Sequence, residues 1–147
     1  MVERIATPKS TRTGTLLLVS PLGEDIRCLG RLLSGSGWSV RPARTCREGA
    51  VLLRESAAAV VICERDLPDG DWRHILGASA LLAPPPSLIV ISRLADEFLW
   101  AEVLNLGGWD VLGRPLREEE VLLAVDSAWQ HWVSRWEGAA RVRKAIA

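Results

Sequence analysis

Strand-length apolar runs alternate with helical patterns along most of this 147-residue sequence. The first run, Thr15–Ser20, is followed by residues that place Ile26, Leu29 and Leu33 on one face of a helix. A short run that is apolar at nearly every position is typical of a strand buried on both faces. The alternation therefore predicts parallel strands joined by helical crossovers that cover both faces of one sheet.

The pattern occurs five times along the chain. The predicted strands are Thr15–Ser20, Trp38–Ala43, Ala58–Cys63, Ser87–Ser92 and Asp110–Gly113. The predicted helices are Glu24–Leu33, Cys46–Ser56, Trp72–Leu82, Asp96–Leu106 and Glu118–Trp136. The predicted fold class is therefore α/β.

A chain of this length fits one domain. Residues Met1–Gly14 are polar and predict a flexible N-terminal arm, and residues 15–136 form the predicted domain. The basic tail, residues 137–147, predicts either a solvated helix end or a frayed terminus. We expect the chain to act as a stand-alone domain.

Charge and cysteine content limit the classes of partner. Eighteen basic and eighteen acidic residues cancel, so no overall field attracts nucleic acid. The three cysteines Cys28, Cys46 and Cys63 lack the paired spacing of a zinc or redox site, which favours reduced thiols in a cytoplasm. No apolar run approaches the roughly 18 residues of a membrane span, and the N-terminus has no signal core. We expect a cytoplasmic protein with neither nucleic acid nor membrane as a partner.

The carboxyl ends of the predicted strands carry Ser20 and Pro21, Glu64, Ser92 and Arg114. In an open parallel sheet, the functional crevice lies beyond these ends. We therefore expect any chemistry of the domain to be found among these residues.

Three stretches carry these strand ends: "VVICERDLPDG", "SLIVIS" and "GGWDVLGRP". They resemble parts of the receiver domains of bacterial two-component response regulators. "VVICERDLPDG" is similar to the segment in which the phospho-accepting aspartate of the family stands four residues before a proline, and Glu64 holds that position before Pro68. "SLIVIS" resembles the fourth strand of the family, which ends in Thr or Ser, and "GGWDVLGRP" places Arg114 at the family's lysine position. The resemblance covers about residues 15–130. It implies a flavodoxin-like three-layer α/β/α sandwich with a five-stranded parallel sheet of order 2-1-3-4-5.

The positions of the family's acidic pair differ in this chain. The resemblance implies that this pair holds Mg²⁺ for phosphoryl transfer, and here it falls on Ser20 and Pro21, which supply no anionic ligand. Glu24 and Asp25 follow, and we interpret them as favourable charge at a helix start, able to reach the crevice only if the loop were rebuilt. The sequence predicts no metal site and no cofactor.

The acceptor and lysine positions differ as well. Glu64 is one methylene longer than aspartate, which displaces its carboxylate by more than about 1 Å, and such a misplacement can cost about 10²-fold in rate. Arg114 has a planar fork suited to a carboxylate, whereas lysine is a compact point charge. The Glu64 and Arg114 side chains could form an ion pair or both point into solvent, and the sequence leaves both possibilities open.

The remaining positions of the resemblance concern the switch. Asp66 is a candidate acceptor only if the loop were shifted, because it stands two residues too late for the proline spacing. Ser92 keeps the hydroxyl of the switch, but Val111 stands where the family has an aromatic residue. A valine has no ring to move between buried and exposed states, so the usual relay is not expected.

The sequence contains seven tryptophans and no tyrosine. Trp129, Trp132 and Trp136 continue a stripe begun by Leu122 and Val125 at spacings of three and four. Core packing explains the start of this stripe. We expect its last turns to overhang the domain and form a partner surface, most simply a homodimer through the fourth and fifth helices.

Together these features predict a degenerate receiver, or pseudo-receiver, that acts in bacterial signal transduction by binding a protein and not as an enzyme. The predicted partner is a second copy, a histidine kinase or another signalling protein. No catalytic residue is predicted, since His74 and His131 have neither metal-like nor triad spacing. One alternative is an active phospho-acceptor that uses Glu64 or Asp66. Another is a small-ligand binder on the same fold, for which the strand ends offer no Gly-rich or aromatic feature.

Overall fold

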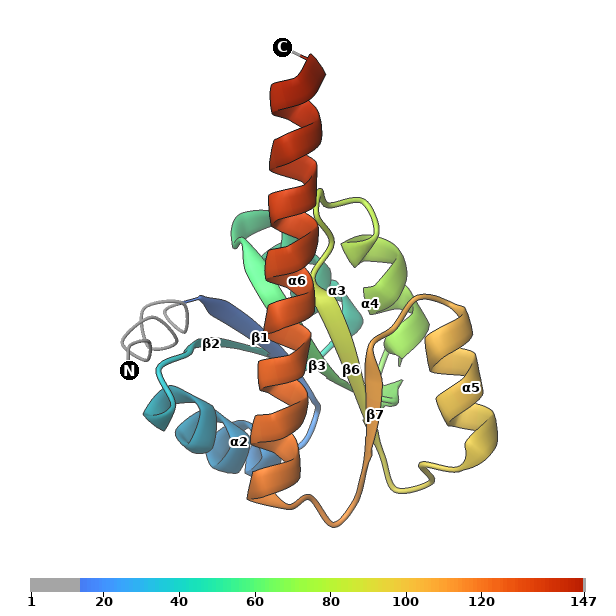
Figure 1. The fold of residues 1–147 in the computed structure, drawn as a ribbon. Helices are drawn as coiled ribbons and strands as arrows, with labels where there is room; N and C mark the ends of the chain where they lie inside the picture. The colour runs from blue at the N-terminus through green and yellow to red at the C-terminus, as the bar shows by residue number, and fades with distance from the viewer. Residues whose placement is uncertain (1–13, 147) are drawn as a thin grey trace.

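Five parallel strands form the central sheet of the computed structural model, which describes residues 14–146 (Figure 1). The predicted arm therefore lies outside the described residues, apart from Gly14. The elements in chain order are β1 (Thr15–Val19), α2 (Gly23–Gly35), β2 (Ser39–Ala43), α3 (Cys46–Glu55), β3 (Ala58–Glu64), β4 (Asp66–Leu67), β5 (Gly70–Asp71), α4 (Trp72–Ser79), β6 (Ser87–Ser92), α5 (Glu97–Asn105), β7 (Asp110–Gly113) and α6 (Glu118–Ile146).

The strand order of the sheet is β2-β1-β3-β6-β7, and every pairing is parallel. Since β6 and β7 are the fourth and fifth predicted strands, the predicted fold class and the order 2-1-3-4-5 are confirmed. Helices α2 and α6 cover one face of the sheet, and α3, α4 and α5 cover the other (Figure 1). The hairpin of β4 and β5 pairs only two residues on each side and was not predicted.

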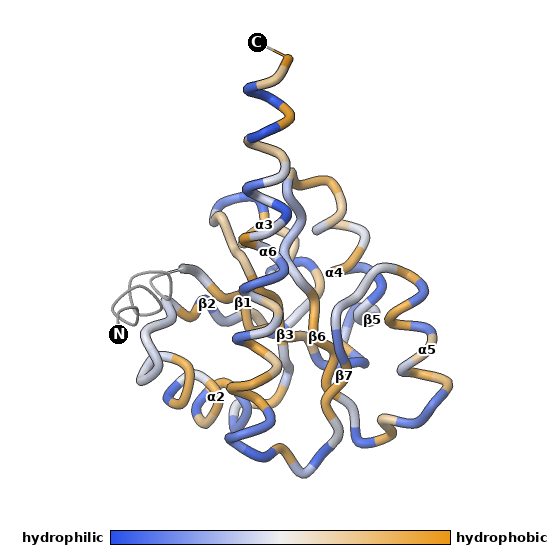
Figure 2. The backbone as a smooth tube through the Cα atoms, in the orientation of Figure 1, coloured by the Kyte–Doolittle hydropathy of each residue, from blue (hydrophilic) through white to orange (hydrophobic). Residues whose placement is uncertain are grey.

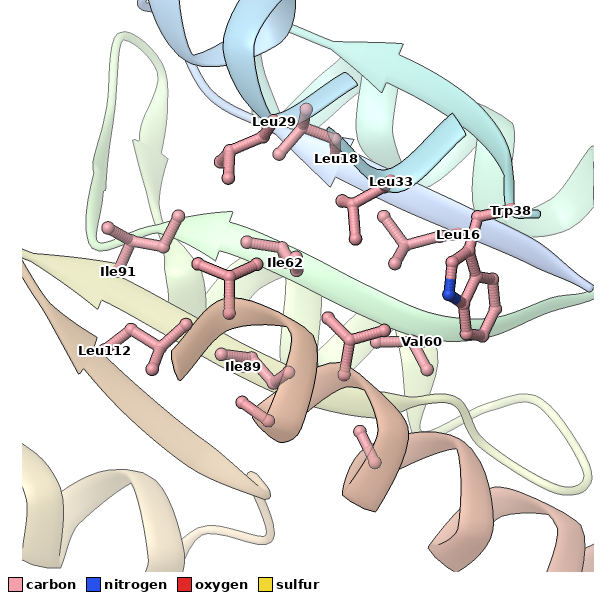
Figure 3. Packing of buried hydrophobic residues seen from close by; sticks show 14 of the residues in the cluster. Leu16, Leu18, Leu29, Leu33, Trp38, Val60, Ile62, Ile89, Ile91 and Leu112 are labelled. Atoms are coloured by element: carbon pink, nitrogen blue, oxygen red, sulfur yellow. The ribbon is translucent and has the colours of Figure 1, made fainter. Parts of the chain in front are cut away.

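Both faces of the sheet are buried, which explains why its strands are apolar at successive positions. In β1, Leu16 and Leu18 pack under α2 and α6, whereas Leu17 and Val19 pack under the opposite helices. Figure 3 shows the first of these two layers, in which β-strand side chains meet Leu29 of α2 and residues of α6. Residues on alternate sides of a strand thus join separate hydrophobic cores.

The turn after β3 holds the start of α3 in place. The Asp69 carboxylate accepts hydrogen bonds from the backbone N–H groups of Cys46, at 2.7 Å, and Arg47, at 3.1 Å. These bonds, the one from Cys46 first, lower the pKa of Asp69. A Cβ at Gly70 would stand 2.7 Å from His74 Nδ1, so this turn favours glycine. The Pro-Asp-Gly sequence therefore has a structural role of its own.

Helix α6 is 29 residues long, about 43 Å at 1.5 Å per residue. The sequence predicts that this helix ends at Trp136, but in the structure it continues through residues 137–146, the predicted tail. Its last turns extend beyond the rest of the domain (Figure 1). Within residues 14–146, no helix has the length and apolar character needed to cross a bilayer.

Candidate functional site

Residues from three strand ends and the first βα loop border a pocket of about 500 Å³ at the carboxyl edge of the sheet. The lining residues are Pro21, Leu22, Glu64, Arg65, Asp66, Ser92, Arg93, Leu94 and Arg114. Sequence analysis expected Pro21, Glu64, Ser92 and Arg114 at this edge, and the structure brings all four together. Ser20, the fifth expected residue, is fully buried beside them.

The Arg114 guanidinium binds two carboxylates at once. Its Nη1 donates to Asp25 Oδ1 at 3.0 Å, and its Nη2 donates to Asp25 Oδ2 and to Glu64 Oε1, each at 2.5 Å. The hydrogen bonds from Arg114 to Asp25, and then those to Glu64, raise the pKa of Arg114 above its usual range. Of the two possibilities left open for Glu64 and Arg114, the structure shows the ion pair.

Asp25 is the residue whose role the sequence analysis interpreted wrongly. It lies in the first turn of α2, as expected, but its side chain is only 7% exposed and reaches Arg114 without any rebuilt loop. The Ser20 hydroxyl donates to Asp25 Oδ2 at 2.7 Å. Asp25 precedes the buried Leu29 and Leu33 at steps of four, so the sequence spacing already placed it on the face of α2 that packs against the sheet. That spacing was the signal for its burial.

The three ionic side chains are mostly shielded from water. Arg114 is 20% exposed and Glu64 is 14% exposed, so the attraction between the charges is screened less than at a surface. The bidentate contact also fixes the orientation of the guanidinium. Arg114 therefore connects α2, the end of β3 and the end of β7 in one arrangement. Glu24, in contrast, is exposed on α2.

These residues do not fit the Mg²⁺ that the resemblance implies. Pro21 offers no side-chain ligand, and the Ser20 hydroxyl is already hydrogen-bonded to Asp25. Asp25 and Glu64 both bind a side-chain cation, which a metal would have to displace. Within residues 14–146, no group of three or more His, Cys, Asp or Glu side chains is arranged to hold a metal ion.

The two switch positions are held by local contacts. The Ser92 hydroxyl is 3% exposed and accepts a hydrogen bond from the backbone N–H of Leu94 at 3.0 Å. Its carbonyl accepts from the Arg114 backbone N–H at 3.1 Å. Val111 is partly buried against the core beneath α3, α4 and α5. The other candidate acceptor, Asp66, is exposed in β4 at the rim of the pocket.

The histidines and buried cysteines lie outside this pocket. His74 Nδ1 accepts from the Asp71 backbone N–H at 3.4 Å at the start of α4, and His131 stacks on Trp109 with ring centroids 4.3 Å apart. Burial raises the pKa of the Cys46 thiol to about 11 and that of Cys63 well above its ordinary value. Both thiols are therefore protonated at neutral pH and are poor nucleophiles.

The tryptophan stripe is divided by the structure into a buried part and an exposed part. Trp129 packs edge-on against Trp38 and stacks on Trp132, with ring centroids 5.5 Å apart in both pairs. Trp129 and Trp132 are partly buried against the core beneath α2 and α6. Trp136, at 50% exposure, stands beyond that core. Of the three residues expected at a partner surface, Trp136 is the one most accessible to another molecule.

Comparison with known proteins gave matches in structure but not in sequence: no protein-family model and no curated protein sequence matches the chain. The signal receiver domain of an HD domain-containing protein from Pseudomonas fluorescens Pf-5 is 28% identical, with a TM-score of 0.77 over 86% of this chain and 93% of that one. A CheY-like response regulator receiver domain protein from Methanospirillum hungatei JF-1 is 19% identical, with a TM-score of 0.75 over 82% and 97% of the two chains.

A third similar structure is a complex. The CheX–CheY complex with BeF3 and Mg²⁺ from Borrelia burgdorferi gives 20% identity and a TM-score of 0.73 over 79% of this chain and 89% of the matched chain. All three comparisons cover nearly the whole of the matched chain. They bear out the resemblance drawn from the sequence.

Proposed function

We propose that this chain, which has the receiver-domain fold of response regulators, is a degenerate receiver that binds signalling proteins in the cytoplasm and does not accept a phosphoryl group. Under this proposal it is not an enzyme. The ion pairs of Arg114 with Asp25 and Glu64, at the carboxyl edge of the sheet, hold the domain in one conformation.

The observation that carries this proposal is the state of Glu64, which occupies the acceptor position implied by the resemblance. Phosphoryl transfer to a carboxylate needs a cation that is available to neutralise the transferred group. Glu64 Oε1 accepts a hydrogen bond from Arg114 Nη2 at 2.5 Å. The same guanidinium also holds Asp25, so the cation of the site is already shared by two carboxylates.

Phosphorylation is the direct test. After incubation with acetyl phosphate and Mg²⁺, the intact mass of the protein is expected to be unchanged, because Arg114 is already bound to Asp25 and Glu64 and the part of the chain that the structure describes has no cluster of acidic side chains arranged to hold the metal. A working receiver domain treated in the same way is the positive control. A stoichiometric gain of one phosphoryl group would contradict the proposal.

The same experiment decides the alternative of an active phospho-acceptor. Asp66 favours that alternative, since it is exposed and lines the pocket, whereas the carboxylates that Arg114 binds within residues 14–146 are those of Asp25 and Glu64. If mass were gained, the Asp66→Asn and Glu64→Gln variants would show which carboxylate carries the group. Loss of the gain in one variant alone identifies the acceptor.

The proposed self-association uses the surface between α5 and α6. Leu99 and Val103 of α5 face the core, and Glu102 turns toward Arg73 of α4. At about 100° per residue, Trp100 lies on the side of α5 that points away from α4. It is 52% exposed. On α6, Leu123 is 72% exposed and borders an open hollow of about 630 Å³, which is lined by residues of β7 and α6 and by Ala95 in the loop before α5.

We expect the wild-type protein to form dimers through this surface. Replacing Trp100 and Leu123 together with glutamate should raise the dimer dissociation constant at least about 30-fold, because even one apolar residue central to an interface contributes about 2 kcal/mol or more. Sedimentation velocity measures the change. Leu81→Glu is the matched control, because Leu81 is 87% exposed after α4 and away from this surface. A monomeric wild type at high concentration would overturn the dimer.

A further inference from the structure

The last turns of α6, residues 135–146, are called here the projecting end of α6. Figure 1 shows them beyond the sheet and its other helices. Figure 2 shows that this segment alternates between hydrophobic and hydrophilic residues along its length. Three of its apolar side chains are well exposed: Trp136 at 50%, Val142 at 59% and Ile146 at 79%.

The apolar side of the projecting end continues the side of α6 that packs on the sheet. Positions 18 residues apart point in the same direction, because about 3.6 residues make one turn. Val142 therefore lies in line with Ala124, and Ile146 lies in line with Ala128. Ala124 and Ala128 are buried in the core, at 6% and 0% exposure. The apolar side of α6 that packs in the core therefore extends beyond the rest of the domain, where no other element of residues 14–146 covers it.

The positive charge and the orientation of this segment disfavour two kinds of binding partner, a second copy of the segment and a lipid bilayer. The segment contains one acidic residue, Glu137, and four basic residues: Arg135, Arg141, Arg143 and Lys144. Pairing this segment with the same segment of a second copy would place like charges together, which costs free energy in either orientation. A flat bilayer is also disfavoured, since the apolar face points to the same side as the sheet and the body of the domain would collide with the lipid.

The basic side chains of this segment also influence their surroundings. The positive charge of this segment affects His131, whose pKa is lowered first by burial and then by Arg135.

We propose that the projecting end of α6 binds an acidic amphipathic helix of a partner protein. This inference rests on the proposed function as a protein-binding module and names the chemistry of one partner. The apolar side chains of the partner helix pack on Trp136, Val142 and Ile146, and its carboxylates face the surrounding arginines and Lys144. From Trp136 to Ile146 the contact is about 15 Å long, or three helical turns, which suits helix-on-helix packing.

The test uses a defined probe: a helical peptide of about 14 residues, or four turns, with leucine at heptad a and d positions and glutamate at most others. Isothermal titration calorimetry with the full chain is expected to show saturable binding that weakens with salt. A matched peptide with lysine in place of glutamate should bind at least about 10-fold more weakly, because it meets like charges. Failure of the acidic peptide to bind would overturn the proposal.

Variants locate the contact. Val142→Glu with Ile146→Glu should weaken the acidic peptide at least about 10-fold through lost apolar contact, while circular dichroism stays unchanged. Arg141→Glu with Lys144→Glu should weaken it and reduce its salt dependence. The matched charge control is Arg31→Glu with Arg54→Glu, two exposed arginines on α2 and α3. Equal binding by the projecting-end variants and the control would overturn the assignment.

Two further measurements test the other possible partners of the projecting end, a second copy of the chain and a lipid surface. Self-association that is lost in the Val142→Glu, Ile146→Glu variant but kept in the α5–α6 surface variant would assign the projecting end to a second copy and overturn the proposal. Co-sedimentation with phosphatidylglycerol vesicles, lost in the same variant, would assign it to lipid and overturn it as well. Phosphoryl uptake from acetyl phosphate would contradict only the degenerate receiver, so the two proposals fail separately.

Discussion

Replacing Arg114 with methionine is expected to lower the free energy of unfolding by about 3 kcal/mol. The substitution leaves the Asp25 and Glu64 carboxylates close together, mostly buried and without their cation. Removing one partner of a buried ion pair is costly for this reason, whereas removing all the charges together is often tolerated. Urea denaturation followed by tryptophan fluorescence measures the change.

The rescue variant makes this prediction specific. Adding Asp25→Asn and Glu64→Gln to Arg114→Met should recover most of the lost stability, because no unpaired charge remains. Arg117→Met is the control, since Arg117 is exposed three residues further along the chain. The ion-pair argument fails if Arg114→Met costs no more than Arg117→Met, or if the triple variant is no more stable than the single one.

Trp129→Ala is expected to destabilise the domain by about 3 kcal/mol, at the low end for a buried tryptophan because the ring is only partly buried. The ring contacts Trp38 and Trp132 and packs against the hydrophobic core beneath α6. Trp136→Ala should change stability by less than about 0.5 kcal/mol, because that ring lies beyond the core. Urea denaturation of the two variants side by side provides the measurement. Equal losses would show that the two tryptophans have the same environment.

The strands of the sheet could be predicted because burial on both faces produces continuous apolar runs in the sequence, whereas their order was implied by the resemblance to receiver domains. Runs such as Ser87–Ser92 are buried at every position, and none of the helices within residues 14–146 is apolar in the same continuous way. The hairpin of β4 and β5 produces no such run, since two paired residues on each side are too few for a pattern. Similarly, Glu137 and Gly138 interrupt the apolar stripe directly after Trp136, although the helix and its apolar side continue to Val142 and Ile146.

The pocket could be predicted only in part. The strand ends that carry Glu64, Ser92 and Arg114 follow from the fold, because parallel strands end at one edge. The ion pair did not follow, since its formation depends on side-chain torsions. Asp25 was missed because acidic residues are common in the first turn of a helix for electrostatic reasons alone. Its spacing from Leu29 and Leu33 contained the missing information.

The contacts of Arg114 also bear on how the domain folds. Its hydrogen bonds close stretches of 89 residues to Asp25 and 50 residues to Glu64. Contacts between such distant parts of a chain require loop closure before they stabilise anything, so they form late in folding. Interactions absent from the transition state act on the unfolding rate. Arg114 should therefore extend the lifetime of the folded domain while leaving its folding rate almost unchanged.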